Sequence, residues 1–275
     1  MSGTTERDVR VDVRNHYAAR LTAGTSCCGG ASSGGEAQCC GAAGAAPAED
    51  APAQTADVLG YSADERAAVP EAAAMSLGCG NPQAIAKLRA GEVVVDLGSG
   101  AGFDCFLAAR AVGPEGRAIG VDMTPEMIER ARATASSRGF DNAEFRLGEI
   151  EHLPVADASV DVVISNCVVN LSPDKAAVYA EAFRVLKPGG RIAIADTVAT
   201  APVPDDAKLD TELWSACASG SLEIGELDRI LTNVGFTDVR ITPKDESRRM
   251  ISEWVPGSDI HEYIVSAHIE AVKPR

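Results

Sequence analysis

The sequence lacks the features that mark several large classes of protein. Lys and Arg total 25 against 40 Asp and Glu, a formal net charge of −15, so the basic face of a nucleic-acid-binding protein is not expected. No apolar run approaches the roughly 18 residues of a membrane span. The first ten residues are polar and charged, unlike a signal peptide. We therefore expect a cytoplasmic protein with no nucleic-acid or membrane partner.

Common metal-binding patterns are also missing. The four histidines show no metal-ligand spacing and are expected at the surface or in packing; they are His16, His152, His261 and His268. Cys79, Cys167 and Cys217 are separated by 88 and 50 residues, which is unlike the paired C-x₂-C spacing of a structural zinc site. A site built from these three thiols would have to be assembled by the fold, and thiolates suit a soft ion.

Cysteine itself is abundant, with eight residues in the chain. Four of them, Cys27, Cys28, Cys39 and Cys40, fall within a Gly/Ala/Ser-rich segment at residues 22–56, which we expect to be a flexible loop. In a cytoplasmic protein most thiols stay reduced, so we expect these four to be an incidental solvated segment or a metal-binding tract. Cys105, beside Phe106 and Leu107, is expected to pack in the core.

From residue 92 onward, apolar β-branched runs alternate with helical patterns. Strands are expected at 93–97, 117–122, 143–147, 160–165 and 191–196, with helices at 103–112, from 124 and from 172, the last stopped by Gly189-Gly190. Such alternation predicts right-handed βαβ units and an α/β fold with a mostly parallel, Rossmann-like sheet flanked by helices.

The flanking segments complete the expected organisation. A helix is predicted over 7–21 and short helices over 64–90, and helices near 205–218 and 224–234 precede closing strands at 239–242 and 263–272. We expect an N-terminal helix and Cys-rich segment (1–60), an α/β core (61–200) and a C-terminal cap region on the substrate side (201–275).

The loop from Asp96 to Gly102 joins the first strand to the first helix of this core. Its small residues let a ligand approach the backbone, whose N–H groups face it. A dinucleotide fingerprint would require glycine where Phe103 stands. Asp122 ends the second strand, 20 residues after Gly102, where it can accept hydrogen bonds from ribose hydroxyls.

These motifs resemble those of class I methyltransferases, which bind S-adenosylmethionine. An acid followed by G-x-G-x-G ends their first strand, and residues 148–154 and 187–190 match two further family segments. Glu149 competes with Glu151 for the acidic contact near the adenine. The resemblance implies a cofactor site made of Asp96, Gly98, Ser99, Gly100, Gly102, Asp122, Met123, Ile150, Glu151 and Asn166.

Three further motifs resemble arsenite methyltransferases: Gly78-Cys79-Gly80, residues 165–171 around Cys167, and Trp214 to Cys217. Residues 14–17 and the Cys-rich segment look like the bacterial branch of that family. The resemblance implies that Cys79, Cys167 and Cys217 hold trivalent arsenic, which receives the methyl group of S-adenosylmethionine. It also implies a redox role for the Cys-rich segment, at least one of whose thiols reaches Cys79, with reduced thioredoxin or glutathione as external reductant.

Three other functions stay open from the sequence. A methyltransferase of a quinone, sterol or other small organic acceptor would share the glycine loop without needing the cysteines. An arsenite-binding protein without turnover would need the cysteines without transferring a methyl group. A structural protein loaded with zinc would use the thiols as metal ligands.

Overall fold

The computed structural model describes residues 9–23, 59–69, 78–215, 217–254 and 257–275. The expected redox residues Cys27, Cys28, Cys39 and Cys40 lie outside these ranges, as does most of the proposed segment 1–60. Within the described residues no helix combines the length and apolar character needed to cross a membrane.

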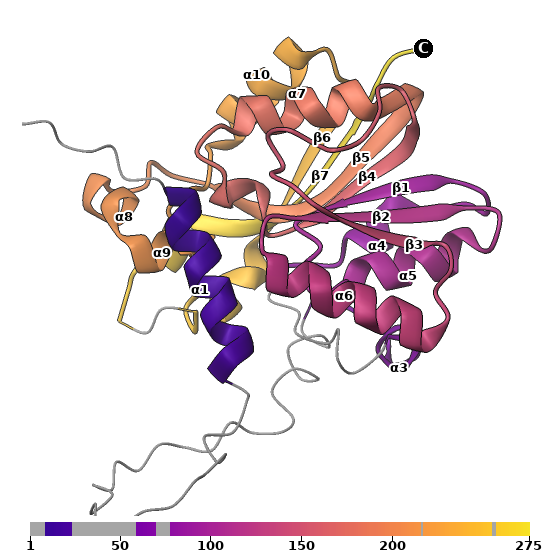
Figure 1. Cartoon of the computed structure of the whole chain (residues 1–275). Helices are drawn as coiled ribbons and strands as arrows, with labels where there is room; N and C mark the ends of the chain where they lie inside the picture. Colours follow the sequence, from indigo (N-terminus) through magenta and orange to yellow (C-terminus); the bar gives the residue numbers. More distant parts are fainter. Residues whose placement is uncertain (1–8, 24–58, 70–77, 216, 255–256) are drawn as a thin grey trace, which may run out of the picture.

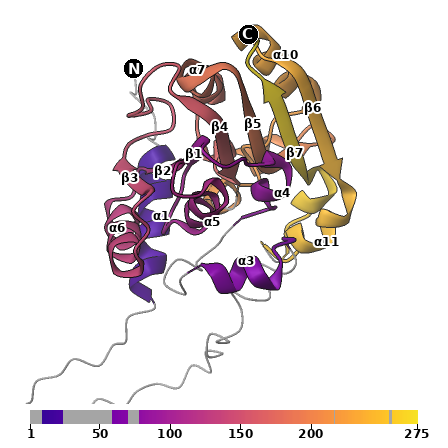
Figure 2. The same cartoon turned by 90° about the vertical axis from the view of Figure 1, so that its right-hand side faces the viewer.

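A seven-stranded sheet forms the centre of the molecule (Figure 1). Its strand order is β3-β2-β1-β4-β5-β7-β6, and Figure 2 shows this order from β1 to β6. The first five strands pair in parallel, whereas β7 runs antiparallel to both β5 and β6. The strands are β1 (Val93–Leu97), β2 (Arg117–Asp122), β3 (Ala143–Leu147), β4 (Val160–Asn166), β5 (Leu186–Ala199), β6 (Thr237–Lys244) and β7 (Ile264–Val272). The expected mostly parallel α/β sheet is confirmed.

Helices cover both faces of this sheet. In Figure 1, α4, α5 and α6 lie on one face, and α7 and α10 lie on the other. The helices are α1 (Val9–Ala23), α3 (Ala63–Ala68), α4 (Pro82–Ala86), α5 (Phe103–Val112), α6 (Pro125–Arg138), α7 (Lys175–Val185), α8 (Asp205–Leu209), α9 (Thr211–Ser215), α10 (Ile224–Val234) and α11 (Arg248–Ile251), with short 3₁₀ turns η2 (Val169–Leu171), η3 (Asp245–Ser247) and η4 (Ile260–Glu262). Because both faces are covered, β1 and β4 are apolar on both sides, and Val94, Val95, Val162 and Val163 are fully buried.

Two expected elements differ from the structure. The helix expected over 205–218 is two short helices, α8 and α9, separated at Asp210, whose carboxylate accepts from Leu213 N at 3.2 Å and starts the second one. The helix that was expected to end at Gly189-Gly190 ends at Val185, where Leu186 already has extended backbone angles. Residues 187–190 belong to β5, whose pairing with β4 shifts register between Val160 and Val162.

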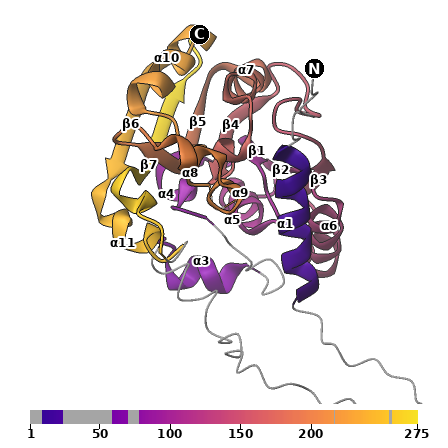
Figure 3. The same ribbon diagram turned by 90° about the vertical axis from the view of Figure 1, so that its left-hand side faces the viewer.

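The carboxyl ends of the parallel strands all meet at one edge of the sheet. Figure 3 shows α1, α8 and α9 lying across this edge, and α1 contacts both α9 and α6. In open parallel sheets, ligands bind outside the carboxyl ends of the strands. The fold therefore places the expected ligand site at this edge, next to α1.

Candidate functional site

The glycine loop after β1 is tied to the end of β2. Gly98 and Gly100 have φ of 66° and 51°, values that glycine adopts without steric cost. Gly100 N donates to Asp122 Oδ2 at 2.9 Å, and Thr124 N donates to Asp122 Oδ1 at 2.8 Å. One carboxylate thus fixes both the loop and the start of α6, and it keeps further lone pairs for a ligand.

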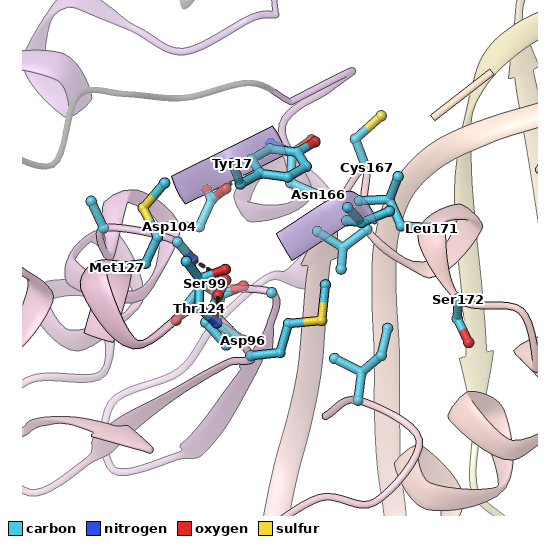
Figure 4. Close-up of a pocket in the computed structure, with 18 of the residues that line it drawn as sticks. Tyr17, Asp96, Ser99, Asp104, Thr124, Met127, Asn166, Cys167, Leu171 and Ser172 are labelled. Atoms are coloured by element: carbon cyan, nitrogen blue, oxygen red, sulfur yellow. Dashed lines mark hydrogen bonds between the residues drawn. The ribbon is translucent and has the colours of Figure 1, made fainter. Parts of the chain in front are cut away.

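A cavity lies between this loop, α1 and the start of η2 (Figure 4). Of the ten residues expected to bind a cofactor, nine line it: Asp96, Gly98, Ser99, Gly100, Asp122, Met123, Ile150, Glu151 and Asn166. The tenth, Gly102, lies at the start of α5, where a Cβ would come 2.8 Å from both Phe106 and Phe145. Its place in the structure is explained by close packing of the helix against the sheet.

Two polar atoms at this cavity are buried without a hydrogen-bond partner among the described residues. They are Asp96 Oδ2 and Ser99 Oγ. Burial raises the pKa of Asp96 well above its usual value, and the nearby carboxyls of Asp104 and Asp122 raise it further. Buried polar groups are normally paired, so this wall of the cavity suits a ligand that carries hydrogen-bond donors or positive charge.

A hydrogen-bond network behind the cavity was not anticipated from the sequence. Tyr61 Oη donates to both carboxylate oxygens of Asp104, at 2.8 and 3.0 Å, and Asn166 Nδ2 donates to Asp104 at 3.2 Å. Asn166 Oδ1 also accepts from Cys79 N at 3.0 Å. Burial raises the pKa of Asp104 to about 6, although the Tyr61 and Asn166 donors oppose that rise. The network joins the cavity wall to the backbone of Cys79.

Helix α1 closes the cavity from above. Arg10 Nε donates to Glu151 Oε1 at 3.2 Å, and the same oxygen accepts from Ser172 Oγ at 2.6 Å. Val13, which is 1% exposed, and Tyr17 face inward from the same helix. The repeat of apolar residues predicted this helix but gave no sign of what it covers.

The three candidate arsenic ligands pack together. Cys79, Cys167 and Cys217 form one buried cluster with Val13 and Leu171, each thiol residue being no more than 3% exposed. Cys217 Sγ donates to Cys167 O at 2.6 Å, and Cys79 Sγ donates to Ala195 O at 3.6 Å. Cys79 comes from the turn before α4, Cys167 follows β4, and Cys217 follows α9. Cys167 also lines the cavity, as Figure 4 shows.

Two of these cysteines have a left-handed backbone conformation, which residues other than glycine rarely adopt. The φ angles of Cys167 and Cys217 are 58° and 60°. Such conformations cost about 1–3 kcal/mol each and persist where the surrounding structure enforces them, often at functional sites. The chain thus holds both thiols in orientations that an ordinary strand end or helix end would not give.

Flanking glycines let Cys79 approach the sheet. A Cβ on Gly78 would lie 2.3 Å from Asn166 Nδ2, and a Cβ on Gly80 would lie 2.8 Å from Ala195 Cβ. Any larger residue at either position would push the turn away from β4 and β5. The Gly-Cys-Gly motif therefore has a steric reason in this fold.

Burial controls the protonation of the thiols. Loss of solvent raises the pKa of Cys79, and it raises the pKa of Cys167 well above its usual value, with the neighbouring thiols adding to the rise at Cys167. Both thiols are therefore protonated in the ligand-free protein at neutral pH. Cys105 lies apart from this cluster, fully buried among the apolar residues of α5 and β2 as expected.

A buried carboxyl beside the thiols was also missed. An oxygen of Asp196, at the end of the parallel part of β5, lies within 4.8 Å of the sulfurs of Cys79 and Cys167, which lie equally close to each other. Burial raises the pKa of Asp196 to about 6, against the effect of the backbone donors Thr197 N and Asn170 N and of the nearby Lys175 ammonium. The sequence did offer a signal for it: the expected strand 191–196 ends at Asp196, and an acid at the carboxyl end of a parallel strand lies at the edge where ligands bind.

The chain is similar in sequence to known methyltransferases. Residues 88–235 match the family described as "Methyltransferase domain". The chain is 51% identical over 269 residues to an arsenite methyltransferase of Halobacterium salinarum, a match covering 97% of this chain and 67% of the relative. It is 42% identical over 179 residues to an arsenite methyltransferase of Aquipseudomonas alcaligenes, which covers 62% of this chain and 51% of that protein. The chain thus spans between half and two thirds of the length of these curated relatives.

A solved structure is similar as well. The crystal structure of an arsenic(III) S-adenosylmethionine methyltransferase from Chlamydomonas reinhardtii aligns with a TM-score of 0.58 at 32% identity, covering 82% of this chain and 73% of that one. A phosphoethanolamine N-methyltransferase from Haemonchus contortus aligns with the same TM-score at 18% identity, covering 72% and 54%. The second match supports the fold alone.

The buried carboxyl of Asp104 leads to a prediction about stability. Its folded pKa of about 6 lies above the ordinary value of 3.8, so its ionised form destabilises the fold at pH 7. That penalty is on the order of 3 kcal/mol for a shift of about two pKa units. It is lost as the pH falls from above 6 toward 3.8, and below that value the carboxyl is protonated in both states.

We therefore expect the wild-type protein to gain stability relative to Asp104→Asn as the pH falls from 7.5 to 4.5. Urea unfolding of both proteins at several pH values measures the difference, and comparison with the variant cancels the titration of groups they share. A difference in unfolding free energy that stays constant over this range would contradict the prediction.

Proposed function

The chain belongs to the arsenite methyltransferase family, and from this premise we propose that it transfers the methyl group of S-adenosylmethionine to trivalent arsenic held by Cys79, Cys167 and Cys217. The observation that carries the proposal is the convergence of three buried thiols from three separate elements, one of which, Cys167, lines the cavity beside the glycine loop. A methyltransferase of an organic acceptor has no need of such a cluster.

Trivalent arsenic suits this set of three thiols. Arsenous acid, As(OH)₃, is a neutral molecule, and three thiols replace its three hydroxyls to give a tris-thiolate and three waters. Each thiol proton leaves with a hydroxyl as water, so no net charge is buried and no separate base is required. The raised pKa values of Cys79 and Cys167 are therefore compatible with loading, and thiolates are the preferred ligands of soft ions.

The methyl donor fits the opposite wall of the cavity. S-adenosylmethionine supplies an activated methyl group on a sulfonium. Asp96 and Ser99 offer the buried, unpaired oxygens that a ligand with an amino group and positive charge requires. We expect Asp122 to accept from ribose hydroxyls and the segment around Ile150 and Glu151 to hold the adenine, as the family resemblance implies. Asn166 lies beside this wall, and its Oδ1 accepts a hydrogen bond from Cys79 N. This bond fixes the position of the Cys79 backbone relative to the donor site.

The reaction also needs a source of electrons. Methyl transfer raises arsenic formally from the trivalent to the pentavalent state, and two electrons return it to the trivalent state. Two protein thiols that form a disulfide supply those electrons, and an external thiol such as thioredoxin or glutathione restores them. We propose that Cys27, Cys28, Cys39 or Cys40 provides one of the two thiols, with Cys79 as its partner.

The proposed organisation of the chain follows from these roles. Residues 61–200 carry the donor site with Cys79 and Cys167, and residues 201–275 add Cys217 and the closing strands β6 and β7. Residues 1–60 add α1, which covers the cavity, and the Cys-rich segment. The arsenic site is therefore complete only when the core and the C-terminal region pack together.

The substrate assignment predicts that Cys167→Ser abolishes arsenic methylation. The variant loses one of three arsenic ligands, and the hydroxyl of serine is a poor replacement for a soft ion. Purified protein with labelled S-adenosylmethionine, arsenite and a thiol reductant provides the assay, and methylated arsenic is the product measured. Cys105→Ala is the matched control, since the Cys105 side chain packs in the apolar core and not in the thiol cluster, and it should retain activity. Full activity in Cys167→Ser would contradict the arsenic-ligand role.

The redox assignment predicts a different defect. Changing Cys27, Cys28, Cys39 and Cys40 together to Ser should leave the first turnover intact, because the arsenic ligands and the donor site are untouched. Later turnovers should stop, since arsenic is not returned to its trivalent state. Rapid-quench measurement of product per enzyme distinguishes the two phases. Undiminished multiple turnover would remove the Cys-rich segment from the cycle.

A further inference from the structure

Asp196 is the buried acid closest to the thiol cluster. Its side chain is enclosed, with 2% of the residue exposed. One of its oxygens and the sulfurs of Cys79 and Cys167 all lie within 4.8 Å of one another. Arsenic bonded to both sulfurs therefore lies beside this oxygen.

The position of Asp196 relative to the cavity is informative. Among the described residues, the lining of the cavity includes Asn166 and Cys167 but does not extend to Asp196. The carboxylate thus lies outside the space proposed for the methyl donor. A charge there acts on arsenic without obstructing the approach of the methyl group.

The carboxylate is held rigidly in this position. Thr197 N and Asn170 Nδ2 donate to Oδ1 at 2.8 and 2.9 Å, and Asn170 N donates to Oδ2 at 3.3 Å. Asn170 is itself fixed by hydrogen bonds to the carbonyl and hydroxyl of Thr197. These donors orient the carboxylate, one oxygen of which lies within 4.8 Å of the sulfurs of Cys79 and Cys167.

Methyl transfer moves positive charge from the methyl donor to the arsenic, close to this carboxylate. The arsenic lone pair forms the new As–CH₃ bond, while the electron pair of the broken S–CH₃ bond stays on the donor sulfur. The sulfonium becomes a neutral thioether, S-adenosylhomocysteine, and the neutral arsenic tris-thiolate becomes a methylarsonium cation. One unit of positive charge therefore moves to the arsenic, in a part of the protein from which water is excluded.

We infer that Asp196 is a further catalytic residue of the proposed reaction, the countercharge that stabilises the positive charge developing on arsenic. This inference rests on the proposed function. A fixed charge acts strongly in a buried site because little solvent screens it and it needs no reorganisation as the reaction proceeds. Removing one such group from an active site typically lowers kcat by about 10²–10³-fold. Because bound arsenic is neutral before the reaction, arsenite binding should change little.

The test is the substitution Asp196→Asn in the full chain, with Asp196→Glu retaining the charge. Arsenite affinity is measured without methyl donor by intrinsic tryptophan fluorescence, because both tryptophans of the chain, Trp214 and Trp254, pack against the thiol cluster. The rate of the first methyl transfer is measured at saturating arsenite and S-adenosylmethionine. Glu92→Gln serves as the matched control, because this carboxylate pairs with Arg191 at the opposite edge of the sheet, and its rate should equal that of the wild type.

We expect Asp196→Asn to bind arsenite within about threefold of the wild type and to transfer the methyl group about 100-fold more slowly. Asp196→Glu should recover most of the rate.

An Asn variant with a wild-type rate would overturn the inference. So would an Asn variant whose arsenite affinity falls in step with its rate, since that result would indicate an arsenic ligand or a structural role. If circular dichroism shows the Asn variant unfolded, the Glu variant decides: a rate as low as 1% with intact arsenite binding would overturn the inference. Failure of the wild type to methylate arsenite would instead refute the proposed function.

Discussion

The parallel register of β1, β4 and β5 is the constraint on which the rest of the structure depends. Asp96 pairs with Ile164, and Asn166 pairs with Ala195, so the three strands end at one level of the sheet edge. A carboxyl for the donor side, an amide in the middle and a carboxyl near the thiols follow in lateral order as Asp96, Asn166 and Asp196. Asp96 and Asn166 point to one face of the sheet and Asp196 to the other, and a shift of one residue in any of these strands would turn its side chain to the opposite face.

Burial of polar groups gives this edge its chemical character. Four carboxyls with raised pKa values, those of Asp96, Asp104, Asp122 and Asp196, lie within the same region as the buried thiols. Removing these groups from water opposes folding, and the hydrogen bonds from Tyr61, Asn166, Asn170 and backbone amides offset only part of the cost. The left-handed backbone of Cys167 and Cys217 adds strain. Stability is thus lower here than the apolar core alone would provide, as is common where binding groups are held ready.

Much of this arrangement could be predicted from the sequence because it is local. Apolar β-branched runs define β1 and β4, and the glycine loop and Asp122 follow from the ends of consecutive strands. The features that were missed depend on contacts between distant segments. Nothing in residues 9–23 indicates that α1 covers the cavity, and the pairing of Tyr61 with Asp104 joins residues 43 positions apart. The role of Asp196 becomes visible only when Cys79 and Cys167 are placed beside it, and the break between α8 and α9 depends on capping by Asp210.

The central claim is that three buried thiols, brought together by the fold, hold the arsenic. X-ray absorption at the arsenic edge tests it directly, with arsenite bound to the full chain in the absence of methyl donor and with a reductant that contains no thiol. The account predicts three sulfur neighbours and no oxygen neighbour, and loss of this environment when Cys79, Cys167 and Cys217 are changed together to Ser. Oxygen neighbours in the wild type, or an unchanged sulfur environment in the triple variant, would contradict it.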